Sequence, residues 1–223
     1  MSVKQSYSQC GEDLIIDFLF QSMLNVHEIS YLDIGSNDPI KLNNTYHFYD
    51  KGFCGVCVDP NPLFKNAYES ARPRDTFLIA GVGPKKGKTK FFEIEPHTLS
   101  TFSEDTAKRY IEEDGHKLVK TYKVPVLPIS DVIKRHFKKI QMPNLLSIDV
   151  EGWDYEIINN MEFEQWHPTV ICMETLTYST RRKQHKIASL IELLKSKGYF
   201  VYADTYINTI FVNQSDWERR DTK

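Results

Sequence analysis

Four short apolar runs in this chain each end in one or two carboxylates, and this repeated pattern most restricts how it can fold. The acids are Asp33, Asp59, the pair Asp149 and Glu151, and Glu174. Isoleucine, leucine, valine and tyrosine suit a buried strand, whereas a carboxylate beside one is costly unless a polar or cationic group meets it. Helix capping is a sufficient reason for one such acid, but a poor one for all four. The pattern therefore indicates buried strands whose ends bring their carboxylates together at one site.

Segments with helical periodicity separate these runs. Residues 11–24 place apolar side chains at 14, 15, 18, 19 and 23, which is the spacing of one face of an amphipathic helix. Strands that alternate with helices predict an α/β fold with a largely parallel sheet covered on both faces. The last two strands, joined by a turn around Asp204, predict a closing antiparallel hairpin. The expected helices span 11–24, 42–49, 61–72, 131–137, 154–161 and 183–196, and the expected strands span 30–34, 53–59, 76–82, 89–95, 117–128, 144–151, 168–174, 199–203 and 206–212.

We expect a single domain over residues 1–223, a length that can bury a full core. Residues 1–29 form its helical lead-in. Residues 96–116 are polar and without clear periodicity, which favours a lid or substrate-binding segment. The prolines within 117–128 are typical of an edge strand.

Charge and composition exclude several classes of partner. The formal net charge of −2 gives no global attraction to nucleic acid or to an anionic membrane. No apolar run approaches the roughly 20 residues that span a bilayer, and the N-terminus lacks the apolar core of a secretion signal. We therefore expect a cytoplasmic protein without a transmembrane segment or a nucleic-acid partner. Its four scattered cysteines predict reduced thiols. The oligomeric state is not predicted.

The strand at 30–34 runs directly into a loop suited to a ligand. Gly35 lets the backbone bend and leaves no side chain between a ligand and the main chain. Asp59 comes 24 residues later, at the end of the next strand, where an acid binds ribose hydroxyls in dinucleotide folds. The phosphate-binding pattern Gly-x-Gly-x-x-Gly is absent, and Asp38 would repel a pyrophosphate. A ligand with a ribose and a cationic tail, such as S-adenosylmethionine, fits better than NAD.

Five segments, taken together and in this order, resemble the FkbM-type methyltransferases. They are SQCGED at 8–13, YLDIGSND at 31–38, NNTY at 43–46, KGFCGVCVDPNP at 51–62 and SIDVEGWD at 147–154. The resemblance runs from about residue 5 to 212 and is weak between 96 and 143. It implies a three-layer, Rossmann-like class I methyltransferase fold with a mostly parallel seven-stranded sheet. It also implies that S-adenosylmethionine methylates a hydroxyl oxygen, often on a sugar or a polyketide-like metabolite.

The resemblance further implies which residues hold the cofactor. Asp33, Gly35 and Asn37 would line its methionine part, and Asp59 would take the ribose. Asn61, with Gly81–Val82, would border the adenine. The full expected set is Gln9, Asp33, Gly35, Ser36, Asn37, Asn44, Asp59, Pro60, Asn61, Gly81, Val82 and Asp149. One departure is Pro39, where relatives often have glycine.

A sugar hydroxyl becomes a strong nucleophile only when its proton leaves. A carboxylate or a histidine can take the proton as general base, or a divalent metal can lower the pKa of the hydroxyl. Asp149, Glu151 and Glu174 suit either route, and His185 is an alternative base. We favour the metal-free base, because Asp149 and Glu151 face the same side of a strand that continues to 151. Magnesium is the alternative that is not favoured.

The sequence thus predicts an S-adenosylmethionine-dependent O-methyltransferase that acts on a sugar hydroxyl of a glycan or glycoconjugate precursor. Two other classes stay open. One is a nucleotide-cofactor oxidoreductase on the same kind of sheet. The other is a Rossmann-like nucleoside-binding subunit without catalysis. The partner in the first reading is a small-molecule or glycan acceptor.

Overall fold

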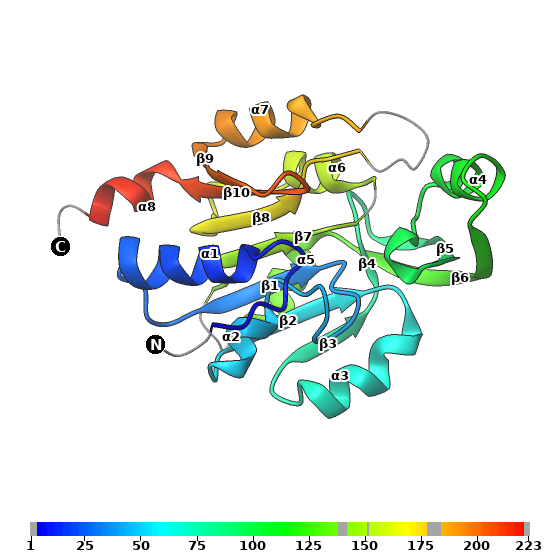
Figure 1. Ribbon diagram of the computed structural model, residues 1–223, viewed down its shortest axis with the longest axis horizontal. Helices are drawn as coiled ribbons and strands as arrows, with labels where there is room; N and C mark the ends of the chain where they lie inside the picture. Colours follow the sequence, from blue (N-terminus) through cyan, green and yellow to red (C-terminus); the bar gives the residue numbers. More distant parts are fainter. Residues whose placement is uncertain (1–3, 138–141, 151, 178–183, 221–223) are drawn as a thin grey trace.

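The centre of the molecule is a seven-stranded sheet of order β3-β2-β1-β7-β8-β10-β9 (Figure 1). The computed structural model describes residues 4–137, 142–150, 152–177 and 184–220. The strands are β1 Ser30–Ile34, β2 Cys54–Asp59, β3 Thr76–Ile79, β7 Leu145–Ile148, β8 Val170–Glu174, β9 Tyr199–Asp204 and β10 Asn208–Asn213. Neighbours from β3 to β8 pair in parallel, and β10 is antiparallel to both β8 and β9. The expected parallel sheet with a C-terminal antiparallel hairpin is confirmed.

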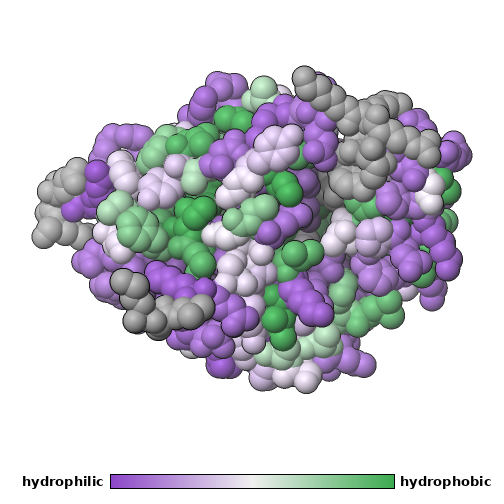
Figure 2. All heavy atoms as spheres, viewed as in Figure 1, coloured by the Kyte–Doolittle hydropathy of each residue, from purple (hydrophilic) through white to green (hydrophobic). Residues whose placement is uncertain are grey.

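Helices cover both faces of this sheet and make three layers (Figure 1). The helices are α1 Glu12–Phe18, continued by the π-helical η1 Leu19–Met23, α2 Tyr46–Asp50, η2 Pro62–Phe64, α3 Lys65–Ala71, α5 Ile129–His136, α6 Asp154–Asn159, α7 Ala188–Ser196 and α8 Gln214–Arg219. Tyr31 of β1 lies in the core with α1 and α2, and its neighbour Leu32 lies in the core with α5, α6 and α7. Because β1 is buried on both faces, it carries apolar residues on each of them, Tyr31 on one and Leu32 and Ile34 on the other. On the surface seen in Figure 2, hydrophobic residues form patches separated by hydrophilic ones.

The expected strand 76–82 is two strands in two sheets, so this prediction was wrong. After Ile79, the chain leaves the main sheet, and β4, Gly81–Val82, joins a small sheet of order β4-β6-β5. The other members are β5 Gly87–Glu95 and β6 Lys117–Leu127. By order β6 is central, yet β4 pairs only with its last two residues. Most of β6 therefore has one neighbour, which explains why it tolerates Pro125.

Several helices and strands begin or end at residues other than those predicted. The helix expected from 42 begins at Tyr46, because the side chain of Asn43 accepts the N–H groups of Thr45 and Tyr46 in a turn. The strand expected to reach 151 ends at Ile148, and the helix expected from 183 begins at Ala188. The α8 helix was not expected.

Residues 96–116, expected as a lid or substrate segment, are folded. They contain η3 His97–Leu99 and α4 Glu104–Glu112. Leu99, Ala107 and Tyr110 pack with Ile94 of β5 in a small core of their own. Figure 1 shows α4 beside the small sheet at one end of the molecule. A lid function for this segment stays a prediction.

A buried arginine, Arg72, connects the loop that follows β1 to the segment between α3 and β3. Arg72 is 1% exposed. Its Nε donates to Asp75 at 2.7 Å, and its terminal nitrogens donate to the side chains of Asn43 at 3.0 Å and Thr45 at 2.9 Å and to the carbonyl of Pro39 at 3.3 Å. The guanidinium group therefore holds residues 39–45 in place with several of its five donors.

Asp75 is the acid that pairs with this arginine. Its carboxylate, whose side chain is 0% exposed, also accepts the Tyr31 hydroxyl at 2.9 Å and the Gly55 N–H at 2.9 Å. The pair is fully hydrogen-bonded, which is the condition under which a buried ion pair is tolerated.

We predict that Arg72→Met lowers the free energy of unfolding by about 3–5 kcal/mol, because it leaves the Asp75 carboxylate buried without its cation. Urea denaturation measures the effect. Lys65→Met is the control, because Lys65 pairs with Glu69 at 3.7 Å on the surface and such pairs contribute about 1 kcal/mol or less. Equal losses in the two variants would contradict this description of the network.

Candidate active site

A cavity of about 410 Å³ opens at the carboxyl ends of β1, β2, β7 and β8. Gly35, Asp59, Asp149 and Glu174, one from the end of each strand, all line it. This edge is where open α/β sheets bind ligands. The structure thus brings together the acids of β2, β7 and β8, as their places in the sequence predict. The lining residues are Gln9, Gly35, Asn37, Asp38, Lys41, Leu42, Asp59, Pro60, Asn61, Phe64, Phe91, His97, Thr98, Leu99, Ser100, Phe102, Asp149, Val150 and Glu174.

Gly35 is required by the backbone at this edge. Its φ is +78°, and a Cβ there would lie 1.7 Å from the carbonyl oxygen of Asp149. The N–H of Gly35 donates to Val58 at 2.9 Å, and the N–H of Asp149 donates to Ile34 at 2.9 Å. The ends of β1, β2 and β7 therefore meet at Gly35, and any side chain there would push them apart.

Asp59 organises the two loops that border the cavity. Its carboxylate accepts the backbone N–H of Asn37 at 2.9 Å and that of Asn61 at 2.8 Å. Burial raises the pKa of Asp59 to about 6, with a smaller contribution from the nearby Asp33, while the two N–H donors act in the opposite direction. The Asp59 carboxyl group thus changes charge around pH 6, where the stability of the protein can be measured.

Part of the cavity wall is aromatic or aliphatic, and these residues were not predicted from the sequence. They are Phe64, Phe91, Leu99 and Phe102. Three of these four residues come from the small sheet and the 96–116 segment, where the family resemblance is weak. The alternating pattern of β5 was the available signal for Phe91, since it predicts one buried face.

Gly81 and Val82, expected beside the adenine, are buried but do not line the cavity. A Cβ at Gly81 would lie 2.4 Å from the ring of Phe102. Phe102 in turn stacks on Trp153 with centroids 4.6 Å apart and planes 5° apart. Gly81 therefore shapes the cavity through the position of Phe102.

Asp33, Ser36 and Asn44 also lie behind the cavity wall rather than in it. Asp33 is 3% exposed and accepts the Thr45 hydroxyl at 2.7 Å. Burial raises the pKa of Asp33, and Arg72 opposes that shift. Asn44 donates to the Ser147 hydroxyl at 3.3 Å, and the buried Ser36 hydroxyl has no hydrogen-bond partner within the described residues. The expected contact between Asp33 and a methyl donor stays a prediction.

The predicted catalytic residues are only partly brought together. Asp149 and Glu174 both line the cavity. Glu151 lies outside the described residues. Because β7 ends at Ile148, strand alternation cannot place Asp149 and Glu151 on one face, and that argument was wrong. His185 is exposed, pairs through its backbone with Thr177 and is not in the cavity wall.

Gln9 reaches the cavity from the N-terminal strap, which we define as residues 5–11. Two buried acids hold this strap. Asp13 accepts the Tyr7 N–H at 2.7 Å, and Glu12 accepts the Thr205 hydroxyl at 2.6 Å from the hairpin of β9 and β10. Both acids are 0% exposed. The strap is therefore fixed over the site by internal contacts.

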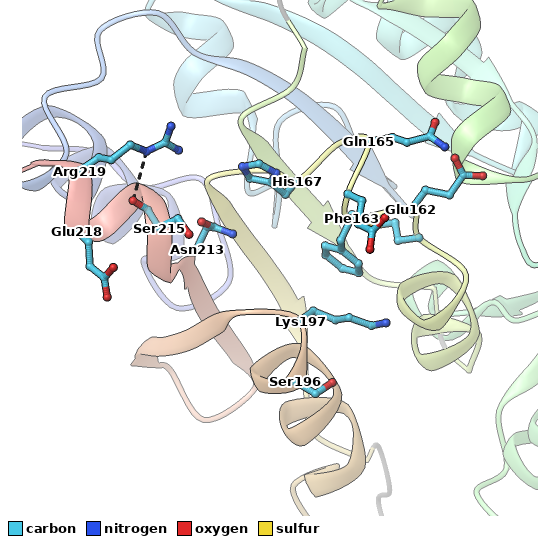
Figure 3. A pocket seen from close by; sticks show the side chains of 12 residues that line it. Glu162, Phe163, Gln165, His167, Ser196, Lys197, Asn213, Ser215, Glu218 and Arg219 are labelled. Atoms are coloured by element: carbon cyan, nitrogen blue, oxygen red, sulfur yellow. Dashed lines mark hydrogen bonds between the residues drawn. The ribbon is translucent and has the colours of Figure 1, made fainter.

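A broader hollow of about 1040 Å³ lies elsewhere (Figure 3). His167 precedes β8, Asn213 ends β10, and Lys197 follows α7, so the hollow is at the opposite edge of the sheet from Asp149 and Glu174. In Figure 3 its side chains spread around the hollow and do not converge on one point. Its polar groups form no constellation for catalysis.

No group of three or more histidine, cysteine, aspartate or glutamate side chains in the described ranges is placed to hold a metal ion. Within those same ranges no helix is long and apolar enough to cross a membrane. The four cysteines Cys10, Cys54, Cys57 and Cys172 are free thiols.

The seven-stranded sheet carries a glycine turn after β1 and a buried acid at the end of β2, and both line the candidate cavity. The model of the methyltransferase FkbM domain matches residues 33–201. This chain belongs to the FkbM methyltransferase family, and it is an S-adenosylmethionine-dependent methyltransferase.

Comparison with solved structures found a TehB-like SAM-dependent methyltransferase from Corynebacterium glutamicum ATCC 13032 Kitasato. The two chains are 8% identical, with a TM-score of 0.43 over 91% of this chain and 87% of that one. A likeness at this level adds nothing to the functional assignment. Comparison with curated proteins gave no match.

Asp59 gives a prediction for the pH dependence of stability. Its folded-state pKa of about 6 exceeds the unfolded value of about 3.9, so the folded protein binds more protons between those values. The contribution of Asp59 to the free energy of unfolding should therefore fall by about 2–3 kcal/mol as pH rises from about 4 to about 6. The measurement is the difference in unfolding free energy between wild type and Asp59→Asn across this range. A difference that grows with pH would mean that the two N–H donors outweigh burial.

Proposed function

We propose that this protein transfers the methyl group of S-adenosylmethionine to a hydroxyl oxygen of a saccharide, within a glycan or glycoconjugate precursor. One observation carries the proposal. Glu174 lines the candidate cofactor cavity and also a second cavity of about 310 Å³ beside it. A carboxylate at the junction of two cavities is suited to act on an acceptor next to a methyl donor.

The first cavity fits the parts of the cofactor. The ribose hydroxyls would donate to Asp59, and the adenine would lie among Phe64, Phe91 and Phe102. The methionine part would lie along Gly35 and Asn37, where the turn leaves the main chain accessible. The close approach of Gly35 to Asp149 gives this part of the cavity a fixed width.

The second cavity fits a polyhydroxylated acceptor. Arg109, Tyr110, Tyr155 and Glu156 line it together with Glu174. Carboxylates accept hydrogen bonds from sugar hydroxyls, arginine donates to their oxygens, and aromatic rings cover the apolar face of a sugar ring. Thr106, Arg109 and Tyr110 come from α4, so the 96–116 segment supports acceptor binding in this proposal.

The chemistry needs one base and a fixed geometry. When bound, S-adenosylmethionine supplies an electrophilic methyl group on a sulfonium. Glu174 or Asp149 takes the proton of the acceptor hydroxyl while the new O–C bond forms and the C–S bond breaks, and S-adenosylhomocysteine leaves. The two cavities would have to hold the acceptor oxygen in line with the methyl group, at about 3–3.5 Å, the separation of a near-attack arrangement. A cytoplasmic location completes the proposal, supported by the four free thiols.

We predict that S-adenosylhomocysteine stabilises the protein and that NADH does not. A ligand at about 100 times its dissociation constant adds about 2.7 kcal/mol to the free energy of unfolding. Thermal denaturation with each ligand measures this. Stabilisation by NADH alone would favour the oxidoreductase alternative, and no response to either ligand would contradict the cofactor assignment.

We predict that Glu174→Gln or Asp149→Asn lowers turnover by about 10²–10⁴-fold, the usual contribution of a general base. In Glu174→Gln the affinity for S-adenosylhomocysteine should stay within about threefold, because the change removes a transition-state interaction. Transfer of labelled methyl groups to a panel of saccharides measures turnover, and calorimetry measures affinity.

His185→Gln is the matched control for these variants, since His185 lies outside the cavity wall. It should retain wild-type turnover. Full activity in both carboxylate variants would remove the base assignment. Cofactor binding without transfer to any saccharide would favour the binding-subunit alternative.

A further inference from the structure

A third cavity, of about 410 Å³, lies on the small sheet, and its chemistry is different from that of the other two. Three cations, Lys88, Lys90 and Lys123, line it with the rings of Phe92 and Phe102. The three lysines are exposed and the two rings are half-buried. Lys88 and Lys90 belong to β5 and Lys123 belongs to β6, so a regular antiparallel pair fixes their places. Figure 2 shows the end of the molecule around β5, β6 and α4 as largely hydrophilic.

The register of the two strands brings like charges together. Lys90 lies directly opposite Lys123, which places their Cβ atoms about 4.5–5.5 Å apart on one face of the pair. None of the three lysines makes an ion pair with another described residue. The acid in the cavity wall, Glu104, pairs with Lys108 at 3.3 Å. Like charges opposite one another destabilise a sheet, so the fold does not account for this arrangement.

The rings beside the lysines connect this surface to the candidate active site. Phe102 lines both this cavity and the cofactor cavity, and it is held there by its stack on Trp153. Cations and aromatic rings on one surface are complementary to a saccharide that carries negative groups, because the rings cover sugar faces and the lysines pair with anions. A neutral saccharide would leave the charge of three lysines unmatched.

We propose that this lysine cavity binds the carboxylate or phosphate groups of an anionic saccharide, and that this saccharide is the methyl acceptor or its immediate extension. The second half of the statement rests on the proposed function, whereas the first half does not. The acceptor would then reach from the second cavity, lined by Thr106 and Arg109, past Glu104 of the same helix α4 to Lys90 and Lys123.

The test compares two double variants that change the net charge equally. Lys90→Gln/Lys123→Gln removes the opposed pair, and Lys85→Gln/Lys86→Gln removes two exposed lysines of the preceding turn, outside the cavity wall. The probes for calorimetry at low salt are tetragalacturonate, mannose 6-phosphate, inorganic phosphate and neutral maltotetraose. Tetragalacturonate or the sugar phosphate should bind wild type and the turn variant with the same affinity. Its affinity for Lys90→Gln/Lys123→Gln should be about tenfold lower or weaker still.

The four probes separate the sources of the anion. Preference for tetragalacturonate identifies a sugar carboxylate, and preference for mannose 6-phosphate identifies a sugar phosphate. Equal weakening in both double variants, or binding of maltotetraose as tight as that of the anionic sugars, would overturn the proposal. Binding of inorganic phosphate as tight as that of both sugars would also overturn it, since the rings would then contribute nothing.

Two further readouts keep folding and the cofactor apart from this result. Lys90→Gln/Lys123→Gln should melt at the same temperature as wild type or higher, because it removes a repulsion; a lower melting temperature would indicate a structural role and contradict the proposal. Its affinity for S-adenosylhomocysteine should be unchanged. Anionic saccharide binding in a protein that binds no S-adenosylhomocysteine would remove the proposed function and leave the lysine site standing.

Discussion

The contact between Gly35 and the main chain of Asp149 is the constraint on which the site depends. A Cβ at Gly35 would lie 1.7 Å from the Asp149 carbonyl oxygen, so the chain must carry glycine where β1 ends. This contact joins the glycine turn, which borders the proposed methionine position, to the end of β7. Asp59 lies beside this junction, because its carboxylate accepts the N–H of Asn37, two residues after Gly35.

Buried charge supports this junction from behind. The Arg72 guanidinium holds the loop that follows Gly35 through Thr45 and Asn43, and Asp75 balances its charge. Asp33 belongs to the same network, because the Thr45 hydroxyl that accepts from Arg72 also donates to Asp33. The Asp33 carboxylate, which the sequence alone would leave buried without a partner, thus accepts a hydrogen bond inside the protein. Its energetic role is to fix the loop, and the acids that face the cavity are Asp59, Asp149 and Glu174.

Most of the sheet was predictable because its signals are local. Apolar runs ending in acids identified β1, β2, β7 and β8, and the closing hairpin followed from two strands with a turn between them. The split of 76–82 was not predictable, because Ile79 and Gly81 enter different sheets without any break in the apolar pattern. The cation that acts on Asp33 through Thr45 was hidden for a related reason. Arg72 is 39 positions later in the chain, and no local rule brings the two together.

The same distinction between local signals and tertiary packing applies to the residues of the site. Residues next to strand ends, such as Gly35, Asn37, Asp59 and Asn61, were identified from the sequence and do line the cavity. The aromatic or aliphatic part of the wall was missed, because Phe91, Leu99 and Phe102 come from a small sheet and a polar segment whose position depends on tertiary packing. The lysine pair at 90 and 123 was equally invisible, since only the register of β5 with β6 places them opposite one another.

A crystal structure of the protein with S-adenosylhomocysteine tests the central claim most directly. The ribose hydroxyls should lie on the Asp59 carboxylate, the adenine among Phe64, Phe91 and Phe102, and the sulfur opposite the side chains of Asp149 and Glu174. A ligand in the broad hollow beside His167, or a ribose bound in the cavity without contact to Asp59, would contradict this site.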